Sequence, residues 1–345
     1  MERANAVPAS ASGSRPSRHS ARGLVFQGKG LATFIFMLTL CGTVQAQLVV
    51  KTNNNGSVSQ NSTLYIDATP AMPQLNLSVS GGALTCDSLW YTLDIDWTAA
   101  SGQQTFVQVS GSFPCNQTNG IAWGSLYAGG TATLTWTDDC GDAGNLTFTI
   151  LGTNPSPAIV DSFLPSTPWF WRNLLAWESA AWTASPTGIY HQFNSSGVPL
   201  NCNCPNGIGL TQLDPQAGGT FPSGANDFWA WNYNLVDGFN LLAGKRSAAY
   251  QSWSNELNDM LNTNGGQPVW PHWSSGVCTF DASPPSGAPA AGTYSFADGD
   301  WIKFYNGGFM IFWNPPLHPG TAGTWDINSD GDPTYVPKVC ASPAI

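Results

Sequence analysis

The chain has 345 residues, and its 21 acidic and 11 basic side chains give a formal net charge of -10 at pH 7. Only 9% of the residues are charged, whereas 16 are tryptophan. This composition disfavours nucleic acid and anionic lipid as partners, because both bind cationic surfaces. Uncharged polymers fit better, and sugars best, since sugar rings stack on indoles while their hydroxyls meet amide side chains.

Residues 1–46 are predicted to be a leader followed by an export signal. An uncharged apolar run from Leu31 to Leu40 follows Lys29 and precedes the small-residue sequence Val44-Gln-Ala46. This pattern is typical of a secretory signal, and the run is too short to span a bilayer as a mature helix. We therefore expect a chain that begins near Gln47, is exported to a periplasm or out of the cell, and has no stable membrane span.

Seven cysteines follow this signal, and export permits disulfides. We predict two bridges, each closing a loop inside one domain: Cys115 with Cys140, and Cys278 with Cys340. Because seven is odd, at least one cysteine is expected to be unpaired. Cys202-Asn-Cys204 is weak evidence for a metal site, because no second close pair accompanies it. We expect neither a metal nor another cofactor.

Residues 47–157 are predicted to form an all-β domain. Side chains alternate with period two, as in Tyr91, Leu93, Ile95 and Trp97, which are separated by Thr92, Asp94 and Asp96. Such alternation is typical of half-buried antiparallel strands. Six or seven strands in about a hundred residues indicate an immunoglobulin-like sandwich. Its titratable groups suggest no chemistry, so a spacer or packing function is favoured over a binding function.

Residues 158–345 are predicted to form a second, mainly helical domain. Thr167 and Pro168 are typical of an N-cap and a first helical position, and the helix they begin can run to about Ala184. A second helical segment spans residues 231–262, although Gly238 and Gly244 could divide it into two helices. Residues 265–292 are rich in Pro, Gly, Ala and Ser, which indicates a surface excursion.

Glu178 lies in the first of these helices, within the most apolar stretch of the mature chain. A carboxyl group that aromatic and aliphatic neighbours desolvate keeps its proton to a higher pH, as a general acid requires. The alternative is an ordinary helix glutamate that faces water. The sequence alone leaves both interpretations open.

Three separated motifs together resemble the soluble lytic transglycosylases and the related goose-type lysozymes, over residues 158–312. They are Glu178-Ser179 in an apolar helix, Gly207-Ile-Gly209-Leu-Thr-Gln212, and Tyr305-Asn306-Gly-Gly. Between the last two, Asn234 and Gly238 are similar to the family's helix that supports the site. The resemblance implies a mainly α, lysozyme-like (α+β) domain that cleaves the MurNAc-GlcNAc β-1,4 bond of peptidoglycan glycan strands.

The resemblance also implies a role for each motif residue. Glu178 would act as the single acid and base, and the C6 hydroxyl of the sugar would attack to give a 1,6-anhydro product. Ser179 and Gln212 would orient the sugar or the acid, and Gly209 would let the backbone approach the substrate. Tyr305 and Asn306 would hold the reacting ring and Glu178.

Two rival functions remain open at this point. One is a lysozyme-type hydrolase, which needs a second carboxylate, and Asp161, Asp214 and Asp237 are candidates by sequence proximity alone. The other is a non-catalytic protein that binds cell wall. Residues 326–332 also suggest a calcium loop, but Pro337 occupies the position of the bidentate acid. We therefore interpret that segment as an acidic turn.

Overall fold

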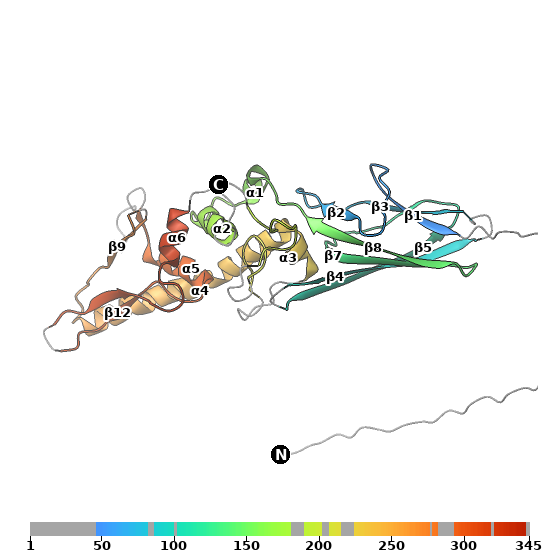
Figure 1. Ribbon diagram of the computed structural model, residues 1–345. Helices are drawn as coiled ribbons and strands as arrows, with labels where there is room; N and C mark the ends of the chain where they lie inside the picture. The colour runs from blue at the N-terminus through green and yellow to red at the C-terminus, as the bar shows by residue number, and fades with distance from the viewer. Residues whose placement is uncertain are drawn as a thin grey trace, which may run out of the picture. The chain divides into compact units, whose positions relative to one another are not determined.

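The computed structural model describes residues 46–81, 86–99, 102–180, 190–201, 207–214, 224–276, 278–281, 293–318 and 321–342 (Figure 1). A region of β-sheet over residues 47–152 is followed by a part rich in helices with small sheets. By contact, the described residues form one compact unit. Among the described residues no helix combines the length and the apolar character needed to cross a bilayer.

The β region contains strands that form two sheets. The strands are β1 (Gln47–Thr52), β2 (Thr63–Ile66), β3 (Leu75–Ser80), β4 (Ser88–Thr98), β5 (Gln104–Pro114), β6 (Asn119–Gly120), β7 (Gly130–Asp138) and β8 (Ala143–Gly152). One sheet has the order β2-β8-β7-β4-β5 and the other β1-β3-β6. All neighbours are antiparallel except β2 and β8. The alternation predicted from the sequence is confirmed.

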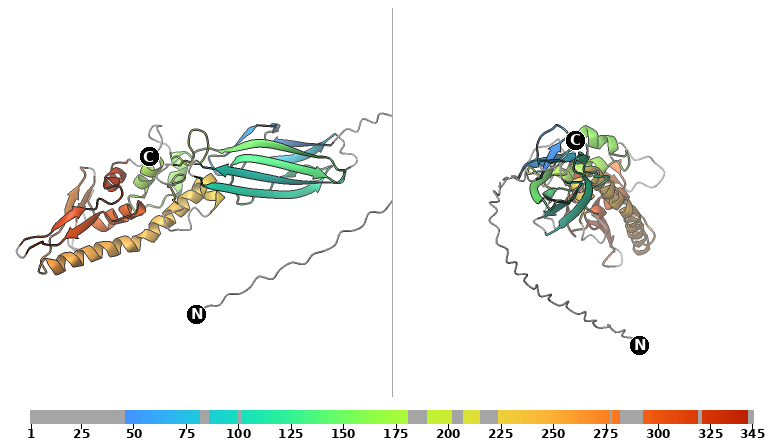
Figure 2. Two further views of the ribbon diagram at one scale, coloured as in Figure 1. Left: turned by 60° about the horizontal axis from the view of Figure 1, so that its bottom comes forward. Right: turned by 90° about the vertical axis from the view of Figure 1, so that its right-hand side faces the viewer.

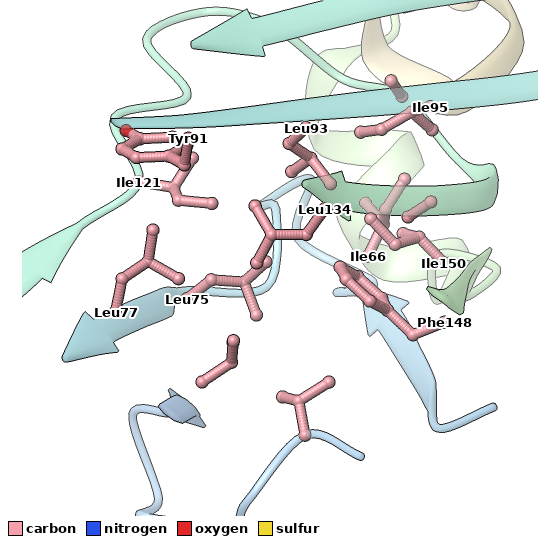
Figure 3. Close-up of a cluster of buried hydrophobic side chains, with 14 of the residues drawn as sticks. Ile66, Leu75, Leu77, Tyr91, Leu93, Ile95, Ile121, Leu134, Phe148 and Ile150 are labelled. Carbon is pink, nitrogen blue, oxygen red and sulfur yellow. The ribbon is translucent and has the colours of Figure 1, made fainter. Parts of the chain in front are cut away.

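One apolar core lies between the two sheets, and Figure 3 shows side chains from both converging on it. In β4 the residues at every second position, Leu89, Tyr91, Leu93 and Ile95, are buried while their neighbours are not. Residues from far along the chain complete this core, namely Phe193, Ile208, Phe228 and Trp229. The hydrophobic core of the sheets therefore includes side chains from beyond residue 157.

The described helices and small strands of the second part follow in order. They are α1 (Pro157–Phe163), α2 (Trp171–Ala180), α3 (Ala225–Trp229), α4 (Trp231–Thr263), β9 (His272–Ser274), β10 (Thr279–Asp281), β11 (Thr293–Tyr294), α5 (Phe296–Tyr305), β12 (Ile311–Asn314), β13 (Thr324–Ile327) and α6 (Tyr335–Ala341). A second core joins α1, α2, α4, α5 and α6. The predicted excursion of residues 265–292 contains β9 and β10, and residues 282–292 lie outside the described residues.

The start predicted for the Glu178 helix is wrong. Thr167 and Pro168 do not cap it, because the helix begins only at Trp171. The carbonyl oxygen of Pro168 accepts the N–H of Trp171 at 3.1 Å, so the chain makes a turn before the helix starts. The expected end near Ala184 falls outside the described residues.

The α4 helix is a single element of 33 residues, and neither glycine divides it (Figure 2). The two glycines differ in their surroundings. A Cβ on Gly238 would lie 2.5 Å from Thr211, whereas a Cβ on Gly244 would meet nothing within 4 Å. Gly238 is therefore required by close packing, while Gly244 only weakens the helix.

Opposite effects on stability are expected when each of these glycines becomes alanine. Gly238→Ala forces Thr211 and α4 apart and should lower the free energy of unfolding by about 2 kcal/mol. Gly244→Ala should raise it by up to about 1 kcal/mol, because alanine is the better helix former. Urea unfolding of both variants measures the difference. A Gly238→Ala protein as stable as the Gly244→Ala protein would contradict this packing.

One of the two predicted disulfides is confirmed and the other is wrong. Cys278 is bonded to Cys340, but Cys115 is bonded to Cys86 rather than to Cys140. The reason is the register of β4 with β5, which pairs Ser88 with Pro114. The adjoining cysteines consequently face each other, with their Cα atoms 6.0 Å apart. Cys202 and Cys204 lie outside the described residues.

Candidate active site around Glu178

Glu178 lies near the end of α2, with only 7% of its surface exposed. Leu174, one turn earlier, is fully buried, and α6 packs on this helix. The hydroxyl of Tyr335, the first residue of α6, donates a hydrogen bond to Oε1 of Glu178. The alternative of a glutamate that faces water is therefore wrong.

Burial changes the titration of this carboxyl group. Desolvation raises the pKa of Glu178 from 4.5 to about 7, and the hydrogen bond from Tyr335 opposes part of that rise. Burial and the neighbouring Glu178 charge also raise the pKa of Tyr335 and of Tyr305. Two neutral phenols therefore lie near one buried carboxyl group, which can hold or release a proton near neutral pH.

Tyr305 ends α5 and connects this carboxyl group to the loop of the second motif. Its hydroxyl donates to the carbonyl oxygen of Thr211 at 2.6 Å. The three motifs found in the sequence thus come together in space, because α2 supplies Glu178, the loop supplies Thr211 and α5 supplies Tyr305. Asn306, in contrast, caps the end of α5 on the exposed surface, and no contact with Glu178 is seen for it among the described residues.

The second motif forms a loop, residues 207–213, that two buried amide side chains hold in place. Asn234 of α4 accepts the N–H of Thr211 at 2.8 Å and donates to the carbonyl oxygen of Ile208 at 3.0 Å. Gln192 accepts the N–H of Leu210 at 3.0 Å. α4 therefore supports the loop through the hydrogen bonds of Asn234 and the close packing of Gly238 on Thr211. Gln192 was not predicted, and its single amide gave no pattern by which the sequence could indicate it.

Gly209 and Thr211 both serve the packing of this loop. Gly209 has a φ of +77°, and a Cβ there would lie 2.5 Å from Asn234 and 2.6 Å from Gln192. The glycine therefore makes room for the two supporting amides. Thr211 is fully buried, and its hydroxyl bonds to Asn234.

Gln212 and Ser179 are buried with unused hydrogen-bonding capacity. The Nε2 of Gln212 donates to the carbonyl oxygen of Gly209 at 2.5 Å. Its Oε1 and the Oγ of Ser179 have no partner among the described residues. Buried polar atoms of this kind generally need a partner. Residues 181–189, 202–206 and 215–223, which adjoin these elements in sequence, lie outside the described residues.

Tyr335 was not predicted, because the resemblance ends near residue 312. Tyr335, Val336 and Val339 recur at helical spacing, and this pattern could have indicated a short helix with one apolar face. That pattern does not predict that the helix packs against α2. Cys340 in the same helix forms the bridge to Cys278, which attaches α6 to the strand β10 region.

A second buried carboxyl group, Asp300 of α5, differs from Glu178 in its surroundings. Burial raises its pKa to about 7, while hydrogen bonds from the backbone of Met310 and Ile311 oppose the rise. Asp300 Oδ1 accepts the Met310 N–H at 2.7 Å, and Asp300 is fully buried. These contacts indicate that Asp300 holds the chain after α5, whereas Glu178 adjoins the motif residues.

The acidic turn of residues 326–332 accepts hydrogen bonds from a lysine side chain of the protein. Lys303 is almost fully buried, and its Nζ donates to the carbonyl oxygens of Asp330 at 2.9 Å and Asp332 at 2.5 Å. The carboxylate of Asp332 instead accepts a hydrogen bond at Oδ2 from Nζ of Lys338, at 2.7 Å. The Lys303 ammonium thus occupies the carbonyl oxygen of Asp332, which is the backbone ligand of a calcium loop that begins at Asp326.

The hydrogen bond from Tyr335 can be tested by titrating Glu178 directly. A chain that begins at Gln47 contains only two glutamates, Glu178 and Glu256, so selective carbon-13 labelling would give two carboxyl signals. Tyr335→Phe should raise the pKa of Glu178 above about 7, by roughly one pH unit, because the phenol stabilises the carboxylate. Tyr305→Phe is the matched control, since that hydroxyl donates to Thr211. Equal pKa values in wild type and Tyr335→Phe would contradict the contact.

No family model matches this chain, and no curated protein matches it in sequence.

Proposed function

We propose that the protein cleaves the MurNAc-GlcNAc β-1,4 bond of peptidoglycan glycan strands, with Glu178 as its acid and base. The observation that carries this proposal is a buried Glu178 whose pKa is about 7 and which adjoins the phenols of Tyr335 and Tyr305. A glycosidic oxygen is a poor leaving group, so it requires a proton as the bond breaks. Glu178 can hold that proton at neutral pH.

The proposed reaction needs only this one carboxyl group. Glu178 gives its proton to the glycosidic oxygen, and the C1–O bond breaks as positive charge develops on the sugar ring. The carboxylate then takes the proton of the sugar's C6 hydroxyl, whose oxygen bonds to C1 to form the 1,6-anhydro product. The Tyr335 hydroxyl would stabilise the carboxylate between the two steps.

A lysozyme-type hydrolase is the near alternative, and it would require a second carboxylate. Asp161 is engaged elsewhere, because Arg172 lies 2.9 Å from its Oδ1 and the Tyr190 hydroxyl lies 3.3 Å from it. Asp214 and Asp237 are partly exposed and stay candidates. Of the three aspartates, a hydrolase would thus have to use Asp214 or Asp237, whereas in transglycosylation the sugar supplies its own nucleophile.

The domain assignments that accompany this function are proposals too. The two β-sheets around one core support an immunoglobulin-like sandwich, and the helices around Glu178 support a lysozyme-like domain. The bridges Cys86–Cys115 and Cys278–Cys340 support an exported protein, because disulfides persist in oxidising compartments.

The proposal is tested by digesting purified cell wall and weighing the released muropeptides by mass spectrometry. A transglycosylase should release products that carry the 1,6-anhydro mass, which is one water less than the reducing sugar. Products with the full reducing sugar would establish the hydrolase instead. Wall that is bound but not cut, by wild type and Glu178→Gln alike, would indicate the non-catalytic wall-binding protein.

A further inference from the structure

The outer face of the five-stranded sheet presents an exposed tryptophan that the proposed reaction does not use. Trp90 of β4 is 47% exposed. Its neighbour Tyr91 points into the core between the sheets, as Figure 3 shows. Because successive side chains of a strand point to opposite faces, Trp90 lies on the face away from that core.

Hydroxyl side chains surround Trp90 on this face. The strand register places Thr137 of β7 opposite Trp90 on one side and Ser112 of β5 on the other. The next row on the same face consists of Thr135, Thr92 and Ser110. Trp90, Thr92, Thr135 and Thr137 line a shallow hollow of about 300 Å³. An indole with hydroxyl groups on both sides therefore forms a shelf, which we call the Trp90 shelf.

The charged side chains of the β region indicate which classes of ligand the Trp90 shelf could bind. Within residues 47–152 the only cationic side chain is Lys51, which belongs to β1 of the other sheet, and every other charged side chain is an aspartate. A nucleic acid or an anionic lipid surface would meet no positive charge on this face. A neutral ligand with an apolar surface for the indole and hydroxyls for the threonines and serines fits the shelf.

We propose that the Trp90 shelf binds β-1,4-linked N-acetylhexosamine glycan. The C–H face of a sugar ring stacks on the indole of Trp90. The hydroxyls of Thr135 and Thr137 donate to the carbonyl oxygens of Thr92 at 3.3 Å and Asp138 at 3.4 Å, so they would accept hydrogen bonds from ring hydroxyls or acetamido N–H groups. The hydroxyl of Thr92 would bond to the same sugar groups. The choice of this glycan class rests on the proposed function, whereas the binding of a neutral sugar rests on the shelf alone. The site would hold insoluble substrate while Glu178 acts on it.

Binding should be measured with the whole chain from Gln47, because side chains beyond residue 157 complete the core beneath the sheet. The Glu178→Gln background prevents cleavage during the assay. Purified peptidoglycan sacculi and chitin are the two solid probes, and the bound fraction is measured by pelleting. Trp90→Ala should weaken binding about tenfold, which is ~1.4 kcal/mol. Trp90→Phe should restore part of it, since a smaller ring still stacks.

Tyr65→Ala is the matched control, because Tyr65 is an aromatic residue of the same sheet, 57% exposed, that does not line the hollow. It should bind both probes as the Glu178→Gln protein does. Thermal unfolding of each variant shows that the fold is kept. Weaker binding to sacculi but not to chitin would assign the shelf to peptidoglycan, and weaker binding to both would assign it to the shared N-acetylhexosamine chemistry.

Two results would overturn the inference: Trp90→Ala bound as tightly as the Glu178→Gln parent, or a parent that binds neither probe. The experiments distinguish a failure of this inference from a failure of the proposed function. If wild type cuts no wall while Trp90→Ala still loses binding, the reaction is wrong and the shelf stands. If wild type cuts wall and Trp90→Ala changes no binding, the reaction stands and the shelf is wrong.

Discussion

Glu178→Gln is expected to lower the rate of cell-wall cleavage by about a thousandfold or more, within the range known for loss of a general acid and base. Glutamine keeps the shape of the side chain and an oxygen that accepts the Tyr335 hydroxyl, so the fold should be retained. It cannot deliver a proton to the glycosidic oxygen. Turbidity of a suspension of purified wall, followed over time, measures the rate.

Glu256→Gln is the matched control for that experiment. Glu256 is the other glutamate of residues 47–345, and its Oε2 accepts the N–H of Trp313 at 2.7 Å, a bond that a glutamine oxygen can also make. This variant should clear wall at the wild-type rate. Equal clearing by wild type and Glu178→Gln would end the assignment of Glu178.

The same rate should depend on pH in a direction set by Glu178. Because its folded-state pKa is raised from 4.5 to about 7, the acid form needed for cleavage is present below pH 7 and is lost as pH rises through 7. Activity should therefore fall on the alkaline side with a midpoint near 7. A midpoint near the ordinary value of 4.5 would show that another group limits the rate.

Removal of the Cys278–Cys340 bridge has the second large expected effect. The bond joins residues 62 apart in sequence, so its loss should lower the free energy of unfolding by ~4 kcal/mol through the entropy gained by the unfolded chain. Replacing both cysteines by alanine avoids burying new hydroxyls, since both positions lie in the second core. Urea unfolding under non-reducing conditions measures the change.

The Cys86–Cys115 bridge provides the comparison. It joins residues 29 apart, so replacing both cysteines by alanine should cost slightly less stability. The two variants should differ in activity, because Cys340 lies in α6 together with Tyr335, while Cys86 and Cys115 belong to the β region. At a temperature where both variants are folded, only loss of Cys278–Cys340 should slow wall cleavage. If wall cleavage slowed equally in both variants, the placement of α6 would not be what supports the site.

Local patterns determined much of the fold of this protein. The period-two burial of Leu89, Tyr91, Leu93 and Ile95 follows from the geometry of a strand with one buried face, and the sequence alone indicates it. The long α4 was similarly indicated by its apolar repeat, although Gly238 and Gly244 made a break plausible. The close packing of Gly238 against Thr211, 27 residues away in the sequence, is a contact that no local rule could supply.

Pairings between distant segments were decided by tertiary structure. Cys115 is bonded to Cys86 because β4 and β5 align in one register. The sequence does not specify that register when the two strands have similar patterns of apolar and polar residues. The helix start at Trp171 was missed for a related reason, since the turn at Pro168 competes with the cap that Thr167 and Pro168 would favour locally.

For the candidate site, the sequence alone indicated Glu178 as the candidate acid and the glycine-rich loop that adjoins it. A lone glutamate in an apolar helix, the glycine-rich motif and Tyr305 were all apparent as residue types and order. The burial of Glu178 and its hydrogen bond from Tyr335 are apparent only in the three-dimensional structure. Burial and a hydrogen bond across 157 residues depend on how α6 packs on α2, and packing is a property of the whole core rather than of any one segment.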